Sequence, residues 1–199
     1  MCQACAEAKA RQKSINKTTN IEERKDWNPG EKLWMDVSSI KHTSYGGAKF
    51  WFLIVDDKTD YCWSYFLKKK NELSQKLENL VMKLKSFGIE IKKIRCDNAG
   101  ENIVAERKMQ EKGRNIKFEF TAPNTPQQNG KVERKFSTLY GTVRATLNDA
   151  NLKGEMRNRL WAECANHCMN QENIGAIERK GCDIPWIKEE QLMTNVKHM

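Results

Sequence analysis

Three apolar segments follow one another between residues 32 and 67, before the first helical pattern of the chain begins. Lys32–Ile40 and Lys49–Val55 are separated by the turn residues Ser44–Gly47, and Asp56–Lys58 separate the second segment from the aromatic segment Tyr61–Leu67. Apolar runs of this length, bounded by glycine, serine and aspartate, are typical of strands, and such short connections join antiparallel neighbours. The sequence therefore predicts a three-stranded antiparallel meander.

Helices and strands alternate in the rest of the chain. A helix is predicted from Asn71, as a candidate N-cap, to a stop at Gly88, because the apolar residues between them recur every three or four positions. The segments expected to follow, a strand, a helix, a strand and two helices, are Ile89–Cys96, Gly100–Lys112, Asn115–Phe120, Val132–Leu147 and Glu155–Gln171. This order predicts an α/β protein with a mixed five-stranded sheet and helices on both faces, which is the element order of the RNase H-like fold.

The charge balance of the chain is basic. Its 35 lysines and arginines outnumber 26 acidic residues, which gives a formal charge of +9. Nucleic acid is the commonest anionic partner of such a chain, although charge that serves solubility alone is the alternative. We expect neither a membrane span nor a secretion signal, since no apolar run approaches the roughly 20 residues that a span requires. The seven irregularly spaced cysteines favour a reducing compartment.

Three carboxylates stand at positions typical of a metal site. Asp36 lies inside a predicted apolar strand, Asp97 ends another strand, and Glu133 lies in the first turns of a predicted helix. Sixty residues separate the first pair and thirty-five separate the second. Three acids brought together repel one another, so a cation must offset their charge. Hard oxygen ligands select Mg²⁺ or Mn²⁺, and two such ions about 3.5–4 Å apart support in-line displacement at a phosphodiester.

The spacing of the three acids leaves other interpretations open. In a chain with 26 acidic residues, some triplet shows any chosen spacing, and Asp36 could instead cap a helix or pair with a lysine. Further acids, Asp56, Asp57 and Asp60, lie in a predicted turn, where we expect them to be solvated. Cys164, His167 and Cys168 share a helical neighbourhood, where packing is a commoner role than metal binding.

The segments around the three acids carry distinctive motifs. Leu33–Val37, Arg95–Glu101 and Thr121–Lys135 each surround one acid, and the last contains the string Pro-Asn-Thr-Pro-Gln-Gln-Asn-Gly. In this order they resemble the integrases of copia-type LTR retrotransposons, which are part of a Pol polyprotein and have a retroviral-integrase-like core. Further segments that match the same family are Phe52–Asp57, Trp63–Lys68, Asp149–Leu152 and Trp161–Cys164. The proline- and glutamine-rich string is the most specific of these motifs.

This resemblance implies a catalytic core that joins the 3′ ends of element DNA to target DNA, or that trims those ends beforehand with water as nucleophile. Asp36 would bridge two Mg²⁺ or Mn²⁺ ions, and Asp97 and Glu133 would each complete one site. The implied partners are element and target DNA and further copies of the chain, and the implied location is the nucleus, reached through a cytoplasmic virus-like particle. The alternatives are a catalytically weak or host-recruited fragment that only binds nucleic acid, and an unrelated RNase H-like nuclease.

The resemblance also suggests domain limits. Residues 1–30 would be the remnant of an N-terminal zinc-binding module with its linker, residues 31–175 the catalytic core, and residues 176–199 a truncated C-terminal extension. Cys2 and Cys5 would be the last two ligands of a His-His-Cys-Cys site. The chain contains no histidine before them, so we expect Zn²⁺ only in a longer protein.

Basic and amide side chains beside Glu133 are the candidates for DNA contact. A solvated helix face is the ordinary interpretation of such a cluster, but the neighbourhood of a metal-bound acid favours contact with phosphate. The amides can donate hydrogen bonds to phosphates or to bases. The predicted DNA-binding residues are Gln127, Gln128, Asn129, Lys131, Arg134 and Lys135.

Overall fold

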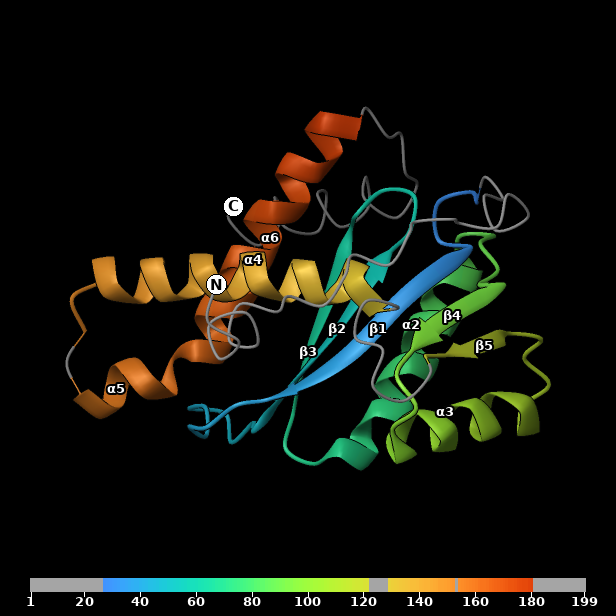
Figure 1. The fold of residues 1–199 in the computed structure, drawn as a ribbon, viewed down its shortest axis with the longest axis horizontal. Helices are drawn as coiled ribbons and strands as arrows, with labels where there is room; N and C mark the ends of the chain where they lie inside the picture. Colours follow the sequence, from blue (N-terminus) through green and yellow to red (C-terminus); the bar gives the residue numbers. More distant parts are fainter. Residues whose placement is uncertain (1–26, 122–128, 153, 181–199) are drawn as a thin grey trace, which may run out of the picture.

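The chain forms one mixed sheet with helices packed on both of its faces (Figure 1). The computed structural model describes residues 27–121, 129–152 and 154–180. Its elements are β1 (Lys32–Ser39), β2 (Phe50–Asp56), β3 (Cys62–Leu67), the 3₁₀ turn η2 (Lys70–Glu72), α2 (Leu73–Ser86), β4 (Lys93–Cys96), α3 (Gly100–Glu111), β5 (Lys117–Phe120), α4 (Gly130–Asp149), α5 (Gly154–Arg159) and α6 (Trp161–Lys180).

The five strands lie in the order β3-β2-β1-β4-β5. β1 pairs antiparallel with β2, and β2 pairs antiparallel with β3, so the predicted meander is confirmed. β1 to β4 and β4 to β5 are parallel pairs, which require the crossovers supplied by α2 and α3. β1 is therefore the central strand, and its neighbour β4 ends directly before Asp97.

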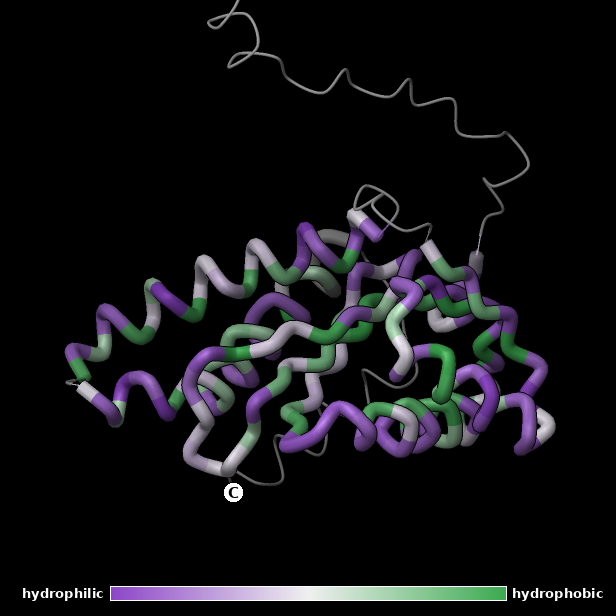
Figure 2. Tube along the Cα trace, turned by 60° about the horizontal axis from the view of Figure 1, so that its bottom comes forward, coloured by the Kyte–Doolittle hydropathy of each residue, from purple (hydrophilic) through white to green (hydrophobic). Residues whose placement is uncertain are grey.

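The sheet separates two apolar cores. In β2, Phe52 and Ile54 face the core beneath α2 and α3, while Trp51, Leu53 and Val55 face the core beneath α4 and α6. A strand covered on both faces is apolar at successive positions, which explains the continuous apolar run of this segment. Hydrophobic and hydrophilic positions alternate along the long helix α4 in Figure 2, as expected for a helix that turns one side to the sheet. Among the described helices, none combines the length and apolar composition that a bilayer crossing requires.

The start of α2 differs from the prediction. Asn71 is not its N-cap but lies inside η2, and Glu72 takes the position before α2. The Glu72 carboxylate accepts the backbone N–H groups of Lys68 and Lys69 at 3.3 and 3.1 Å, which turns the chain one residue later than expected. Gly88 follows the helix with a φ of 76°, a left-handed conformation that glycine adopts without steric cost, so the predicted stop is confirmed.

The single helix predicted over Glu155–Gln171 is wrong, because the chain bends between α5 and α6. The carbonyl of Arg159 accepts the backbone N–H of Tyr45 at 2.7 Å, and the Trp161 indole donates to the carbonyl of His42 at 2.8 Å. These bonds to the β1–β2 connection hold the bend in place. Beyond it, α6 continues to Lys180.

Candidate active site

Asp36 lies in the middle of the central strand with a partly buried side chain. Burial is the largest cause that raises the pKa of Asp36 to about 6. The negative charges of Asp97 and Glu133 raise this pKa further, whereas the N–H of Val37, 2.7 Å from Oδ1, and the ammonium of Lys70 lower it. Asp97 and Glu133 are therefore near enough to Asp36 for their charges to disfavour its ionised form.

Asp97 is held by the first turns of α3. The Nδ2 group of Asn102 donates to Oδ1 of Asp97 at 2.5 Å and to its backbone carbonyl at 3.2 Å, and the N–H of Ala99 lies 3.3 Å from the same Oδ1. Asn102 is buried, so its amide holds the Asp97 carboxylate in one orientation. The sequence reasoning missed Asn102, although an amide in the first turn of a helix that follows an acid was a usable signal.

Glu133 lies in the first turn of α4. The buried side of this helix packs on the sheet and consists of Val132, Phe136, Leu139 and Val143. Asn129, one residue before α4, is buried and donates its Nδ2 to the carbonyl of Met35 at 3.3 Å. That carbonyl belongs to the residue before Asp36, so the bond ties the start of α4 to the central acid. Burial raises the pKa of Glu133, and the charge of Arg134 lowers it.

We call Asp36, Asp97 and Glu133 the carboxylate site. In the ranges that the structure describes, no three His, Cys, Asp or Glu side chains are close enough together to hold a metal ion. The chemistry of the carboxylate site nevertheless fits a hard divalent cation, because all its donors are carboxylate oxygens and Asp36 is destabilised as an anion by the other two. A cation placed among them would relieve that repulsion.

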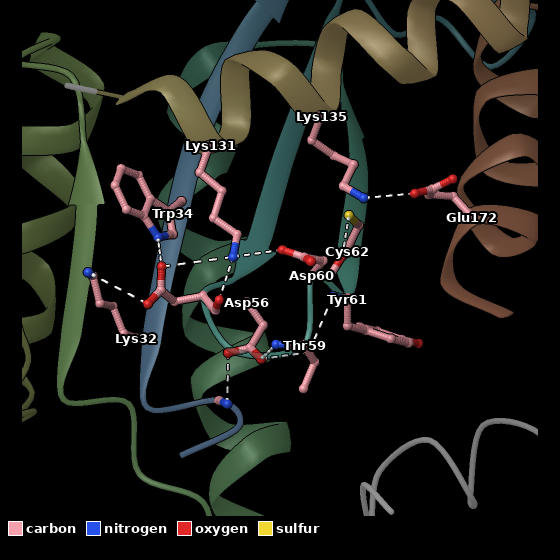
Figure 3. Close-up of polar contacts among 12 residues, drawn as sticks. Lys32, Trp34, Asp56, Thr59, Asp60, Tyr61, Cys62, Lys131, Lys135 and Glu172 are labelled. Atoms are coloured by element: carbon pink, nitrogen blue, oxygen red, sulfur yellow. Dashed lines mark hydrogen bonds and ion pairs between the residues drawn. The ribbon is translucent and has the colours of Figure 1, made fainter. Parts of the chain in front are cut away.

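A second acidic group, Asp56, Asp57 and Asp60, lies where β2 turns into β3, and we call it the aspartate turn. The expectation that all three are solvated is wrong for Asp56, which is fully buried. Its carboxylate accepts the backbone N–H of Gly30 at 2.8 Å, the backbone N–H of Thr59 at 2.9 Å and the hydroxyl of Thr59 at 2.6 Å (Figure 3). These donors satisfy a charge that burial makes costly.

The other two acids of the aspartate turn bind cations of the protein. Asp57 accepts the indole N–H of Trp34 at 2.5 Å and pairs with Lys32 at 3.7 Å. Lys131 reaches down from α4, where its ammonium lies 2.7 Å from Asp60 and also bonds the carbonyl of Asp57 (Figure 3). The aspartate turn therefore bonds β1, β2 and the start of α4 to one another.

The predicted DNA-binding cations of α4 lie beside one hollow of the surface. Lys131, Arg134 and Lys135 line an open hollow of about 280 Å³ with Asp60 and Thr138. Arg134 is exposed, whereas the two lysines are mostly covered by their ion pairs: Lys131 with the aspartate turn, and Lys135 with a glutamate of α6, Glu172, at 2.9 Å (Figure 3).

The remaining predicted site residues divide into two groups. Asn129 is buried against β1, as described above, and is not one of the residues that line the hollow. Gln127 and Gln128, with the zinc candidates Cys2 and Cys5, lie outside the described residues.

A tyrosine and a serine join α4 to β1 beside the carboxylate site. The hydroxyl of Tyr140 lies 2.7 Å from Oγ of Ser38. Burial raises the pKa of Tyr140, the hydrogen bond with Ser38 lowers it, and the charge of Asp36 raises it. The sequence reasoning missed both residues, although Ser38 lies two residues after Asp36 and Tyr140 seven after Glu133, spacings that return to the same face of a strand and of a helix.

Comparison with known proteins identifies Pol polyproteins as homologues, although no protein-family profile matches the chain. The chain is 34% identical over 110 residues, 55% of its length, to the retrovirus-related Pol polyprotein from transposon TNT 1-94 of Nicotiana tabacum. It is 28% identical over 125 residues, 62% of its length, to that from transposon RE1 of Arabidopsis thaliana. Each match covers 8% of the relative, so the chain spans less than a tenth of the relatives' length. These homologues confirm the resemblance and are consistent with a fragment of a copia-type integrase.

The fold has a counterpart among solved structures. A chain in the cryo-EM structure of the simian T-cell lymphotropic virus intasome in complex with PP2A regulatory subunit B56 gamma superposes with a TM-score of 0.54. The match covers 71% of this chain and 47% of that one, at 16% sequence identity. At this identity the likeness concerns the fold alone, and it confirms the predicted RNase H-like architecture.

Proposed function

We propose that this chain is an integrase catalytic core that joins the 3′ ends of retrotransposon DNA to a target DNA strand. The observation that carries the proposal is where the fold places the three acids: Asp36 on β1, Asp97 directly after the paired strand β4, and Glu133 in the first turn of α4, whose start Asn129 ties to β1. Homology to the Pol polyproteins of plant transposons supports the same conclusion. Trimming of the DNA ends before joining belongs to the same chemistry, with water as the attacking group.

In this proposal, Asp36, Asp97 and Glu133 would hold two Mg²⁺ or Mn²⁺ ions. When bound, the ions would activate the attacking hydroxyl and stabilise the leaving oxygen of the cleaved phosphodiester. Asn102 keeps the Asp97 carboxylate in one orientation, and the bond from Asn129 to β1 fixes where α4 presents Glu133. Asn102 and Asn129 thus position two of the three proposed ligands, and the ions would have to draw the three carboxylates together.

DNA would run past the start of α4 in this proposal. Arg134 is exposed and can bind a phosphate directly, whereas Lys131 and Lys135 would exchange their carboxylate partners for phosphates. We further propose contacts from Gln127 and Gln128, assembly of several copies on paired DNA ends, and action in the nucleus after passage through a virus-like particle.

The direct test is Mn²⁺-dependent joining of a labelled oligonucleotide end to a plasmid by the purified chain. We expect Glu133→Gln to abolish joining while the far-UV circular dichroism and melting temperature stay unchanged. Glu163→Gln, at an exposed position of α6, is the matched control and should keep full activity. Joining by Glu133→Gln at the rate of the unmodified chain would overturn the proposal.

A second function, nucleic-acid binding without catalysis, is favoured by one observation: the described acids do not approach one another closely enough to hold a metal ion. Calorimetric titration with Mn²⁺ separates the two functions. Binding that Asp36→Asn removes supports the enzyme, whereas DNA binding without any such Mn²⁺ binding supports the second function.

A further inference from the structure

Lys70 lies in η2, between β3 and α2, and its side chain reaches the first turn of α3. Its ammonium pairs with Glu101 at 2.6 Å and lies 5.8 Å from the ring centre of Phe50. Glu101 stands in the first turn of α3, four residues after Asp97. In Figure 1 the starts of α2 and α3 lie at the lower edge of the sheet, away from α4. Lys70 is thus a cation beside the carboxylate site that α4 does not supply.

Lys70 and the α4 lysines have their partners in different parts of the fold. Lys131 pairs with Asp60 at 2.7 Å and Lys135 with Glu172 at 2.9 Å, so both lysines face the β2–β3 turn and α6. Lys70 instead pairs with Glu101 in the first turn of α3, which follows Asp97. Lys70 therefore places a cation on the α3 side of the carboxylate site, where neither α4 lysine has its partner.

Stability alone does not account for the pair between Lys70 and Glu101. The Lys70 side chain is 43% exposed, and pairs at this level of exposure contribute about 0–1 kcal/mol. Lys68 and Lys69 precede it, and such a run is ordinarily a solvated surface. Lys70 differs because it is folded over Phe50 and onto Glu101, which places its charge beside the acids and leaves it accessible from solvent.

We propose that Lys70 binds a backbone phosphate of the DNA strand that lies across the carboxylate site, and that Glu101 holds the ammonium in place until DNA exchanges for it. The proposal rests on the proposed function for the identity of the anion. A DNA strand that lies over Asp36 would then contact Lys70 on one side and the cations of α4 on the other. A lysine is suited to this role as a mobile point charge that can change partners.

The two members of the pair should affect DNA binding in opposite directions. Loss of Lys70 removes one phosphate contact, so binding should weaken and depend less on salt. Loss of the Glu101 charge frees the ammonium from its competitor, so binding should tighten. A pair that only supported folding would weaken binding from either side.

Fluorescence anisotropy with a labelled 20-base-pair duplex, with Glu133→Gln as the background to prevent turnover, measures both effects. We expect Lys70→Met to raise Kd about 3- to 10-fold and to reduce the slope of log Kd against log salt by about one. Glu101→Gln should lower Kd about 2- to 5-fold, and Lys70→Arg should keep most of the affinity. Lys85→Met, an equal change of charge at an exposed position of α2, should match the background.

Equal Kd values for Lys70→Met and Lys85→Met, weaker binding by Glu101→Gln, or no DNA binding by the background itself would each overturn the inference. Melting temperatures identify any variant that fails to fold. If Lys70→Met does not fold, Lys70→Gln takes its place in the same measurement. The joining assay, run with Glu133 restored, keeps the two proposals apart. If joining is absent but Lys70→Met still weakens binding, the proposed function fails and the phosphate contact stands. If joining occurs and Lys70→Met changes neither Kd nor KM, the phosphate contact alone fails.

Discussion

The carboxylate site and the aspartate turn are two groups of three acids, and they differ in what surrounds them. In the aspartate turn, each acid faces donors or lysines, from the amide of Gly30 to the ammonium of Lys131. In the carboxylate site, the charges that act on Asp36 include those of the other two acids. The acids of the aspartate turn thus have their counter-charges within the protein, whereas the carboxylate site is the one for which we propose an external cation.

Burial affects both groups, so burial does not distinguish them. It is the largest cause that raises the pKa of Asp36 and also that of Asp56. Hydrogen bonds lower both pKa values, from Val37 for Asp36 and from Thr59 and Gly30 for Asp56. The difference is that the charges of Asp97 and Glu133 also raise the pKa of Asp36, whereas the charge of Lys131 lowers that of Asp56. Substitutions in the two groups should therefore change different properties of the protein.

The largest effect should be on activity, from one isosteric change in each group. Asp97→Asn removes a proposed metal ligand, so the joining rate should fall by at least about a thousandfold, several kcal/mol of barrier. Asp57→Asn keeps the shape of the aspartate turn and should retain activity within about threefold. Initial rates of Mn²⁺-dependent joining measure both, and equal losses would remove the functional distinction between the groups.

The next effect is on stability, and it belongs to the aspartate turn. Asp56→Ala leaves the N–H groups of Gly30 and Thr59 and the Thr59 hydroxyl without their acceptor in a buried place. The free energy of unfolding should fall by about 2–4 kcal/mol, measured by urea denaturation. Asp149→Ala, at the exposed end of α4, is the control and should stay within about 0.5 kcal/mol. If Asp56→Ala loses less than about 0.5 kcal/mol, the hydrogen bonds to the Asp56 carboxylate do not stabilise the fold.

A smaller effect, opposite in sign, is expected from the central acid. In EDTA at pH 7, Asp36→Asn should stabilise the protein by up to about 3 kcal/mol, because it removes an anion that the fold disfavours. The folded-state pKa is about 6 against an ordinary 3.8, so the carboxyl of the unfolded chain ionises first as pH rises. The unmodified protein should lose stability relative to Asp36→Asn between about pH 4 and 6, with no difference below that range. Urea unfolding at several pH values measures this, and a variant less stable than its parent at pH 7 would contradict it.

The smallest effect should come from the link between the two regions. Lys131→Met removes the bonds from α4 to Asp57 and Asp60, and the loss of unfolding free energy should be about 0.5–1.5 kcal/mol. Lys85→Met, at an exposed position of α2, is the control for the loss of one lysine charge. The same variant should reduce joining more than this stability loss explains if Lys131 also positions Glu133. Unaltered joining would confine Lys131 to a structural role.

Much of the fold was predictable because its signals are local. The strands of the meander and the helices α2, α3 and α4 follow from apolar periodicity and from glycines such as Gly88 and Gly113, both of which have a positive φ. The bend between α5 and α6 was not predictable, because it depends on Tyr45 and His42, more than a hundred residues earlier in the chain. Tertiary bonds of this kind leave no trace in the helical pattern itself.

The candidate site divides in the same way. Motifs in the sequence mark Asp36, Asp97 and Glu133, and their shared role as metal ligands stays a prediction. The sequence did not predict the burial of Asp56, since the donor from Gly30 lies 26 residues away in the chain. Nor did it predict the pair of Lys70 with Glu101, 31 residues apart, which requires the packing of α2 beside α3.

The central position of β1 has a consequence for how the protein folds. β1 pairs with β2 across a short connection, but it meets β4 only after η2 and α2 have been traversed, and α4 arrives later still. Contacts between distant segments form late, because closing a long loop costs entropy before any contact compensates for it. We therefore expect a partly folded chain to contain the meander while Asp36, Asp97 and Glu133 remain apart. A divalent cation would then bind the completed fold alone, which would slow unfolding and leave the earliest folding events unchanged.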